Sequence, residues 1–135
     1  MIYIIGSWKQ KESINSLESA IRSSAQLKHI PVTSFIRWGE QDQNKGSINM
    51  AYAGMVNLKH IDRAKAIVWV LPPGLAGSYE AGYAEGKGIP VIRYWERCQP
   101  VLLEDEPYLH GPYHANSPTQ LIRALTAMLM TGPVL

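Results

Sequence analysis

The stretch AIVWVLPPGLAGSYEAGYAEGKGIPVI, residues 66–92, decides the fold that the sequence predicts. Residues 66–71 are apolar without alternation, which is typical of a central parallel strand buried on both faces. After Pro-Pro-Gly, a short Ala- and Gly-rich helix is expected from about Ser78 to Glu85. Glycines end this helix, and a second apolar run predicts a strand over 89–94. A strand, a helix and a strand in succession predict a parallel βαβ unit.

The same alternation extends in both directions along the chain. The remaining expected elements are a strand at 2–5, a helix from about Glu12, a strand over 29–38, a polar loop over 39–47, a helix from Ile48 to about Ala64, a short strand that Val101 to Leu103 could form, and a helix with Ser117 as N-cap and Pro118 at its first position. No internal repeat, low-complexity tract or linker interrupts this pattern.

These elements predict a single α/β domain over residues 1–135, with a doubly wound, flavodoxin-like or Rossmann-like parallel sheet of four or five strands. In such sheets, ligands bind beyond the carboxyl ends of the central strands. Two loops should therefore meet there: GSWKQ, residues 6–10, and PPGLAGS, residues 72–78. Their glycines let the backbone approach a ligand closely.

The composition restricts the class of partner. The chain is 46% hydrophobic and 18% charged with a formal net charge of +2, and no Lys/Arg stripe is visible, so nucleic acid is not the expected partner. No apolar stretch is long enough to span a bilayer, so no membrane partner is expected either. A single cysteine, Cys98, and an N-terminus without signal-peptide features favour a cytoplasmic location.

Glu80 stands directly after the second loop and has two interpretations. It could lie in the first turn of a helix capped by Ser78, where the helix dipole favours a carboxylate. The same position would keep the carboxylate ionised, and an ionised carboxylate fixed in a cleft can attack an acetal-type carbon.

Other polar residues give weaker signals. Asp62, Asp42 and Glu40 could be partner acids of Glu80, but solvated surface charges are the expected interpretation. The four histidines lack the spacing typical of metal ligands, so no metal is expected. The sequence also shows no recognisable Ser-His-Asp arrangement. The loop 72–78 lacks both the Walker ending and the GxGxxG pattern, and no cofactor is expected.

Beyond these patterns, the sequence resembles the nucleoside 2-deoxyribosyltransferase-like superfamily, which includes the 2'-deoxynucleoside 5'-monophosphate N-hydrolases. The resemblance covers about residues 2–94 and is more specific in its second half. The pattern there is a strand with Tyr, a Gly-Ser turn, and later a Pro/Gly turn with Ser that leads into Glu-x-Gly-x-Ala. The matching residues are Tyr3, Gly6, Ser7, Pro73, Gly74, Ser78, Glu80, Gly82, Ala84, Gly86, Lys87 and Pro90.

The resemblance implies that Glu80 attacks C1' of a (deoxy)ribose, forms a covalent glycosyl-enzyme and expels the base, after which water or a second base resolves the intermediate. Tyr3 would lie beside the sugar and Glu80 as the second catalytic residue. The substrate-binding residues would be Gly6, Ser7, Trp8, Asn57, Gly74 and Ser78. Superfamily members often carry an Asp where this chain has Asn57, and an amide can bind a hydroxyl but cannot take a proton.

The resulting prediction is cleavage or transfer at the N-glycosidic bond of a (deoxy)nucleoside or (deoxy)nucleotide, a small-molecule substrate. The alternative is a nucleotide-binding or regulatory module of the same fold without turnover, which Asn57 favours. The loop 72–80 also resembles, less closely, that of the phosphoribohydrolases that release cytokinins. Because the superfamily is typically oligomeric and the chain is rich in Trp and Tyr, a homo-oligomer is expected, through the second helix near Tyr52 and Met55 or through the segment near Tyr108.

Overall fold

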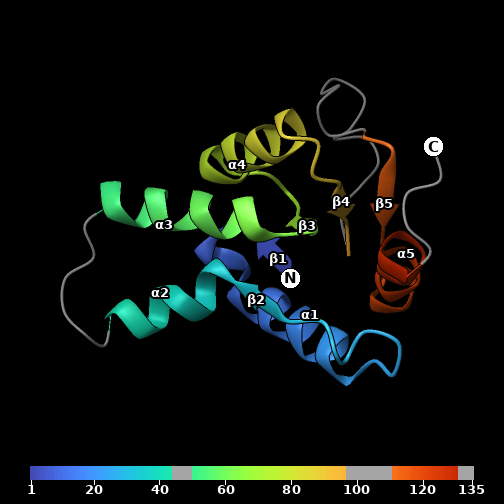
Figure 1. Ribbon diagram of the computed structural model, residues 1–135. Helices are drawn as coiled ribbons and strands as arrows, with labels where there is room; N and C mark the ends of the chain where they lie inside the picture. Colours follow the sequence, from blue (N-terminus) through green and yellow to red (C-terminus); the bar gives the residue numbers. More distant parts are fainter. Residues whose placement is uncertain (44–49, 97–110, 131–135) are drawn as a thin grey trace.

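The structure is a computed structural model that describes residues 1–43, 50–96 and 111–130. Within these ranges the elements are, in chain order, β1 (Ile2–Ile5), η1 (Trp8–Gln10), α1 (Lys11–Ser23), β2 (Val32–Ser34), α2 (Phe35–Gln43), α3 (Met50–Arg63), β3 (Ala66–Val70), α4 (Leu75–Gly86), β4 (Val91–Tyr94), β5 (Tyr113–Ala115) and α5 (Pro118–Met130). Figure 1 shows the sheet between two groups of helices.

The described strands form one sheet of five strands in the order β2-β1-β3-β4-β5, and every neighbouring pair is parallel. This order is the flavodoxin-like one, so the predicted doubly wound α/β fold is confirmed. β1 and β3 are adjacent, with Tyr3 opposite Ile67 and Ile5 opposite Trp69. The strand order reverses between β1 and β3, because β2 lies on one side of β1 whereas β3, β4 and β5 follow on the other. Folds of this kind bind their ligands at the carboxyl ends of the two strands at this switch point.

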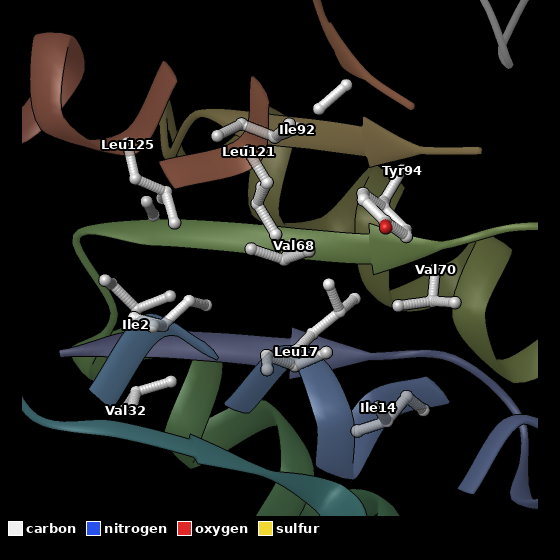
Figure 2. Packing of buried hydrophobic residues seen from close by; sticks show 14 of the residues in the cluster. Ile2, Ile14, Leu17, Val32, Val68, Val70, Ile92, Tyr94, Leu121 and Leu125 are labelled. Atoms are coloured by element: carbon white, nitrogen blue, oxygen red, sulfur yellow. The ribbon is translucent and has the colours of Figure 1, made fainter. Parts of the chain in front are cut away.

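Alternation along the strands divides the core into two layers. On one face, Ile2 and Ile4 of β1 and Val68 of β3 pack with α1 and α5, as Figure 2 shows for Ile2 and Val68. On the other face, the intervening residues Tyr3 and Trp69 pack with residues of α3 and α4. Successive side chains of a strand point to opposite faces, and helices cover both faces of the sheet. Every residue of β1 and β3 is therefore buried, which explains the unbroken apolar runs.

The predicted strand over 29–38 is correct only for its central residues. β2 spans only Val32–Ser34, and α2 begins at Phe35 and runs through part of the predicted loop. The hydroxyl of Ser34 accepts a hydrogen bond from the backbone N–H of Arg37 at 3.2 Å, which is the geometry of a helix cap. This bond satisfies an otherwise unpartnered N–H of the first helical turn, so the chain turns into a helix although its residues are β-formers.

Other boundaries differ by a few residues from the predicted ones. β4 begins at Val91 rather than at residue 89, whereas the predicted start of the helix at Ile48 lies outside the described residues, which contain α3 from Met50. β5 was not predicted, and the expected strand from Val101 to Leu103 lies outside the described residues.

The start of α5 is confirmed. Its first residue is Pro118, and Ser117 Oγ accepts a hydrogen bond from the backbone N–H of Gln120 at 3.2 Å. Across the described ranges, none of the helices has the length and apolar character needed to cross a membrane.

Candidate functional site

A cavity of about 640 Å³ opens beyond the carboxyl ends of β1 and β3. Its wall comes from the loop after β1 (Gly6, Ser7, Trp8), from α2 (Phe35, Trp38, Gly39), from α3 (Ala53, Gly54, Asn57, Leu58), and from the start of α4 with its cap (Gly74, Leu75, Ala76, Gly77, Tyr79, Glu80). Seven of the eight sequence-predicted site residues meet around it: six line the wall, and Tyr3 contacts two of the wall residues.

The two predicted loops are joined by Gln10. Its Oε1 accepts a hydrogen bond from the backbone N–H of Ser7 at 2.9 Å, and its Nε2 donates to the carbonyl oxygen of Pro72 at 3.1 Å. A Cβ on Gly6 would lie 2.7 Å from the same Oε1, so the bridge needs a glycine at this position. The loop after β1 is therefore fixed against the loop after β3, as the parallel fold predicts.

Ser78 is not where the sequence placed it. α4 starts three residues earlier than expected, at Leu75, with Gly74 as its N-cap in an extended conformation. The backbone N–H of Ser78 already donates to the carbonyl oxygen of Gly74 at 3.0 Å, so Ser78 lies inside the helix. Its side chain is exposed and does not line the cavity. The interpretation of Ser78 as a helix cap is therefore wrong.

Glu80 consequently lies in the second turn of α4, and no acidic residue occupies the first turn. Only 6% of Glu80 is exposed, and its Oε2 has no hydrogen-bond partner among the described residues. Burial raises the pKa of this carboxyl to about 7. The expectation of a carboxylate kept ionised by the helix N-terminus is thus wrong, because desolvation outweighs the distant helix end.

Tyr3 lies fully buried on β1 behind the cavity wall. Its hydroxyl accepts a hydrogen bond from Trp38 Nε1 at 2.8 Å and donates one to Asn57 Oδ1. Burial raises the pKa of Tyr3 far above its ordinary value; the hydrogen bond from Trp38 opposes this shift, and the charge of Glu80 adds to it. The Tyr3 hydroxyl therefore keeps its proton near neutral pH.

His60 of α3 is a neighbour of Tyr3 that the sequence did not single out for this site. Its ring stacks on the Tyr3 ring with a centroid distance of 5.2 Å, and the Trp38 ring lies 6.1 Å away at 20°. Burial, with a smaller effect of Arg63, lowers the pKa of His60, so the imidazole is neutral near pH 7. The spacing of His60 from Tyr3 in the sequence gave no signal, because only the packing of α3 on β1 brings the two rings together.

Trp8 and Phe35 form the other aromatic side of the cavity. Trp8 is 45% exposed and meets the Phe35 ring edge-on at 5.6 Å. A Cβ on Gly39 would lie 2.9 Å from the Trp8 ring, so Gly39 lets α2 approach the loop after β1. Tyr79, 67% exposed, adds a further ring from α4.

α4 is held close to the sheet at Gly77. A Cβ at this position would lie 2.9 Å from Nε1 of the buried Trp69 on β3. Only a glycine allows this approach, and Glu80 follows less than one helical turn later. Gly77 thus helps to fix the distance of Glu80 from the sheet.

Of the three other acids named from the sequence, Asp62 is the one whose side chain the structure describes, and it does not line the cavity. Asp62 is exposed on α3 and accepts hydrogen bonds from Lys87 and Tyr83, each at 2.7 Å. The bond from Lys87, followed by that from Tyr83, lowers the pKa of this carboxyl. Asp62 is a surface charge, as expected, whereas the side chains of Glu40 and Asp42 lie outside the described residues.

No group of three or more His, Cys, Asp or Glu side chains in the described part of the chain could hold a metal ion. The polar groups that face the cavity are few: the carboxyl of Glu80, the amide of Asn57, and the groups of Ser7 and the start of α4. The rest of the wall is mainly apolar, with glycines and the aromatic residues Trp8, Phe35, Trp38 and Tyr79. Such a wall suits a ligand with a flat, poorly solvated ring and a small polar part.

Comparison with known proteins supports the fold. No protein-family model matches the chain, and no curated protein matches it. The chain is similar to a solved structure described as a conserved protein from Enterococcus faecalis V583, at 17% sequence identity and a TM-score of 0.67. The likeness covers 95% of this chain and 98% of the other. At this identity the likeness supports the doubly wound α/β fold and carries no statement about function.

Proposed function

We propose that the protein cleaves or transfers the N-glycosidic bond of a (deoxy)nucleoside or (deoxy)nucleotide, with Glu80 as the nucleophile. The observation that carries the proposal is the Glu80 carboxyl itself: it lines the cavity, it is 6% exposed, and its Oε2 has no hydrogen-bond partner among the described residues. A buried carboxyl left unpartnered destabilises the fold, and such costs are typical of functional sites.

The chemistry follows from the charge state of Glu80. With a pKa of about 7, roughly half of the carboxyl is ionised near neutral pH. The ionised oxygen forms an ester bond to C1' of the sugar while the bond from C1' to the base nitrogen breaks, and the departing base takes a proton from water. Water then attacks C1' and releases the sugar, or a second base attacks and completes a transfer.

The aromatic wall supports a nucleobase as the leaving group. The rings of Trp8, Phe35, Trp38 and Tyr79 all face the same cavity. Stacking on an aromatic side chain contributes about 1–3 kcal/mol per base and accepts any base, since every base has a π-face. A volume of about 640 Å³ lies within the usual range for small-molecule sites of roughly 300–1,000 Å³.

A deoxyribosyl donor should react more readily than a ribosyl donor. The transition state at C1' resembles an oxocarbenium ion. A 2'-hydroxyl withdraws electrons from C1', so its absence makes that state easier to reach. The groups at the start of α4 and Ser7 would bind the 5'-hydroxyl or a 5'-phosphate.

One observation favours the alternative of a nucleotide-binding or regulatory module without turnover. Asn57 lines the cavity where the resembling superfamily often has an Asp, and its Oδ1 already accepts a hydrogen bond from the Tyr3 hydroxyl. An amide cannot take up a proton from a substrate. A module of this kind would bind the same ligands and leave them intact.

The proposal extends to assembly and location. A homo-oligomer formed through α3 is supported by Tyr52 and Met55, which are 58% and 60% exposed on one helix. The Tyr108 region lies outside the described residues. A cytoplasmic location is supported by the single cysteine in the chain.

The test is a panel of ribo- and deoxyribonucleosides and their 5'-monophosphates, incubated with the wild-type protein and analysed by chromatography for released base. Release in buffer alone indicates a hydrolase, and a new nucleoside formed only when a second base is added indicates a transferase. Binding without any release would support the regulatory module instead. Absence of both binding and release would contradict the proposed substrate class.

A further inference from the structure

The polar side chains beside Glu80 form a chain of hydrogen bonds with one direction. It starts at Trp38, whose indole N–H can only donate and lies 2.8 Å from the Tyr3 hydroxyl. The Tyr3 hydroxyl accepts this bond and donates its single proton to Asn57 Oδ1. The donated hydrogen bonds therefore run from Trp38 to Tyr3 and from Tyr3 to the amide oxygen of Asn57.

The surroundings of Tyr3 keep this direction fixed. Its side chain is fully buried and stacks on His60, so the ring has little room to turn. If the Asn57 amide were reversed, two donor groups would face each other and the hydrogen bond that Tyr3 donates to Oδ1 would be lost. A buried hydroxyl without an acceptor is costly, so the orientation with Oδ1 toward Tyr3 is the stable one.

This orientation decides what Asn57 offers to a ligand. Its Oδ1 is engaged by Tyr3, and its Nδ2 carries two N–H donors on a side chain that lines the cavity. We propose that Asn57 is a specificity-determining residue that donates a hydrogen bond to an acceptor oxygen or nitrogen of the ligand, with Tyr3 and Trp38 as the residues that orient it. This inference rests on the proposed function, because it takes the ligand to be a nucleoside or nucleotide.

An Asp at this position would offer the opposite polarity. One of its oxygens would accept the Tyr3 proton, and the other would present an acceptor with negative charge to the same ligand atom. Asn57 is then an adaptation to a ligand acceptor rather than the loss of a catalytic acid. The two interpretations predict opposite effects of restoring the carboxylate.

The experiment compares Asn57→Asp with the unchanged residue in Glu80→Gln protein, in which turnover is blocked. The probes are 2'-deoxyadenosine, 2'-deoxyguanosine, 2'-deoxycytidine and thymidine, each titrated by calorimetry. We expect Asn57→Asp to weaken binding of the preferred nucleoside at least tenfold, since a donor is replaced by a repelling acceptor. The matched control is Asn15→Asp, the same change on the exposed face of α1, which should leave the dissociation constant unchanged.

A second variant keeps the test readable if Asn57→Asp fails to fold, which thermal unfolding would reveal. Asn57→Leu has a similar size and no donor, so it should also weaken binding about tenfold or more. Equal or tighter binding by Asn57→Asp, or unchanged binding by Asn57→Leu, would overturn the inference. Base release by the wild-type protein tests the proposed function separately, so binding that depends on Asn57 without any base release would overturn that function and leave this inference standing.

Discussion

Replacing Gly77 by Ala tests how α4 is held against the sheet. The added methyl group would lie 2.9 Å from Nε1 of Trp69, well inside the ordinary contact distance of about 3.5–4 Å. Trp69 is 2% exposed and has the Arg93 guanidinium 5.4 Å from its ring centre, so it has little space to yield. Overpacking of this kind costs about 1–3 kcal/mol, and the better helix propensity of Ala returns up to about 1 kcal/mol.

The same helix offers a matched control, Gly82→Ala. No atom lies within 4 Å of a Cβ at Gly82, which is exposed, so this variant should gain the propensity term alone. The two single-methyl variants should then differ by about 2 kcal/mol in the free energy of unfolding. For a domain of 135 residues this corresponds to a separation of roughly 8 °C in Tm.

Thermal and urea unfolding of both variants give the required values. Gly77→Ala should also lower base release more than Gly82→Ala, because a displaced α4 moves Glu80 within the cavity. If Gly77→Ala proved as stable as Gly82→Ala, the close contact between α4 and Trp69 would not exist. The account of how Glu80 is positioned would then fail with it.

Two further predictions concern charged side chains: the pH dependence caused by Glu80 and the contribution of two ion pairs to stability. Because the pKa of Glu80 rises from 4.5 to about 7 on folding, the unfolded chain releases this proton at lower pH than the folded one, so stability should fall by on the order of 3 kcal/mol between about pH 4.5 and 7. Urea unfolding at several pH values should show that Glu80→Gln removes this decline, and an unchanged decline would contradict the raised pKa. Base release by the wild type should rise over the same pH range, because the nucleophile ionises there. Arg37→Met should destabilise the fold by about 2 kcal/mol, because the 5% exposed Glu18 carboxylate loses its 2.7 Å partner and keeps only Arg22 at 3.7 Å. Lys87→Met, which breaks the exposed pair with Asp62, should leave Tm nearly unchanged, and equal effects of the two changes in thermal unfolding would refute the distinction between the pairs.

The fold could be predicted where a short stretch of sequence indicates by itself how it is buried or where a helix begins. The unbroken apolar run of β3 reports burial on both faces, and the Ser117-Pro118 pair reports a helix start. The second half of the segment 29–38 carries no such signal. Its β-branched and aromatic residues favour a strand by propensity, whereas the cap bond at Ser34 and the contact of Arg37 with Glu18 stabilise the start of α2.

The candidate site divides in the same way. Glu80, Gly6 and Gly74 could be predicted because the carboxyl ends of parallel strands bring their loops together, whereas Tyr3 came from the family resemblance. Trp38 and His60 could not, since they reach Tyr3 only through the packing of α2 and α3. The charge state of Glu80 was also beyond the sequence, because it depends on the start of α4 and on burial.

The central claim is that Glu80 forms a covalent bond to the sugar, and the rate of base release by Glu80→Gln relative to wild type tests it most directly. The amide keeps the shape of the side chain but cannot attack, so release from the best substrate should fall by roughly 10⁴-fold or more while binding persists. Glu12→Gln, the same change at an exposed carboxylate on α1, should retain the wild-type rate. Release by Glu80→Gln at the wild-type rate would contradict the claim.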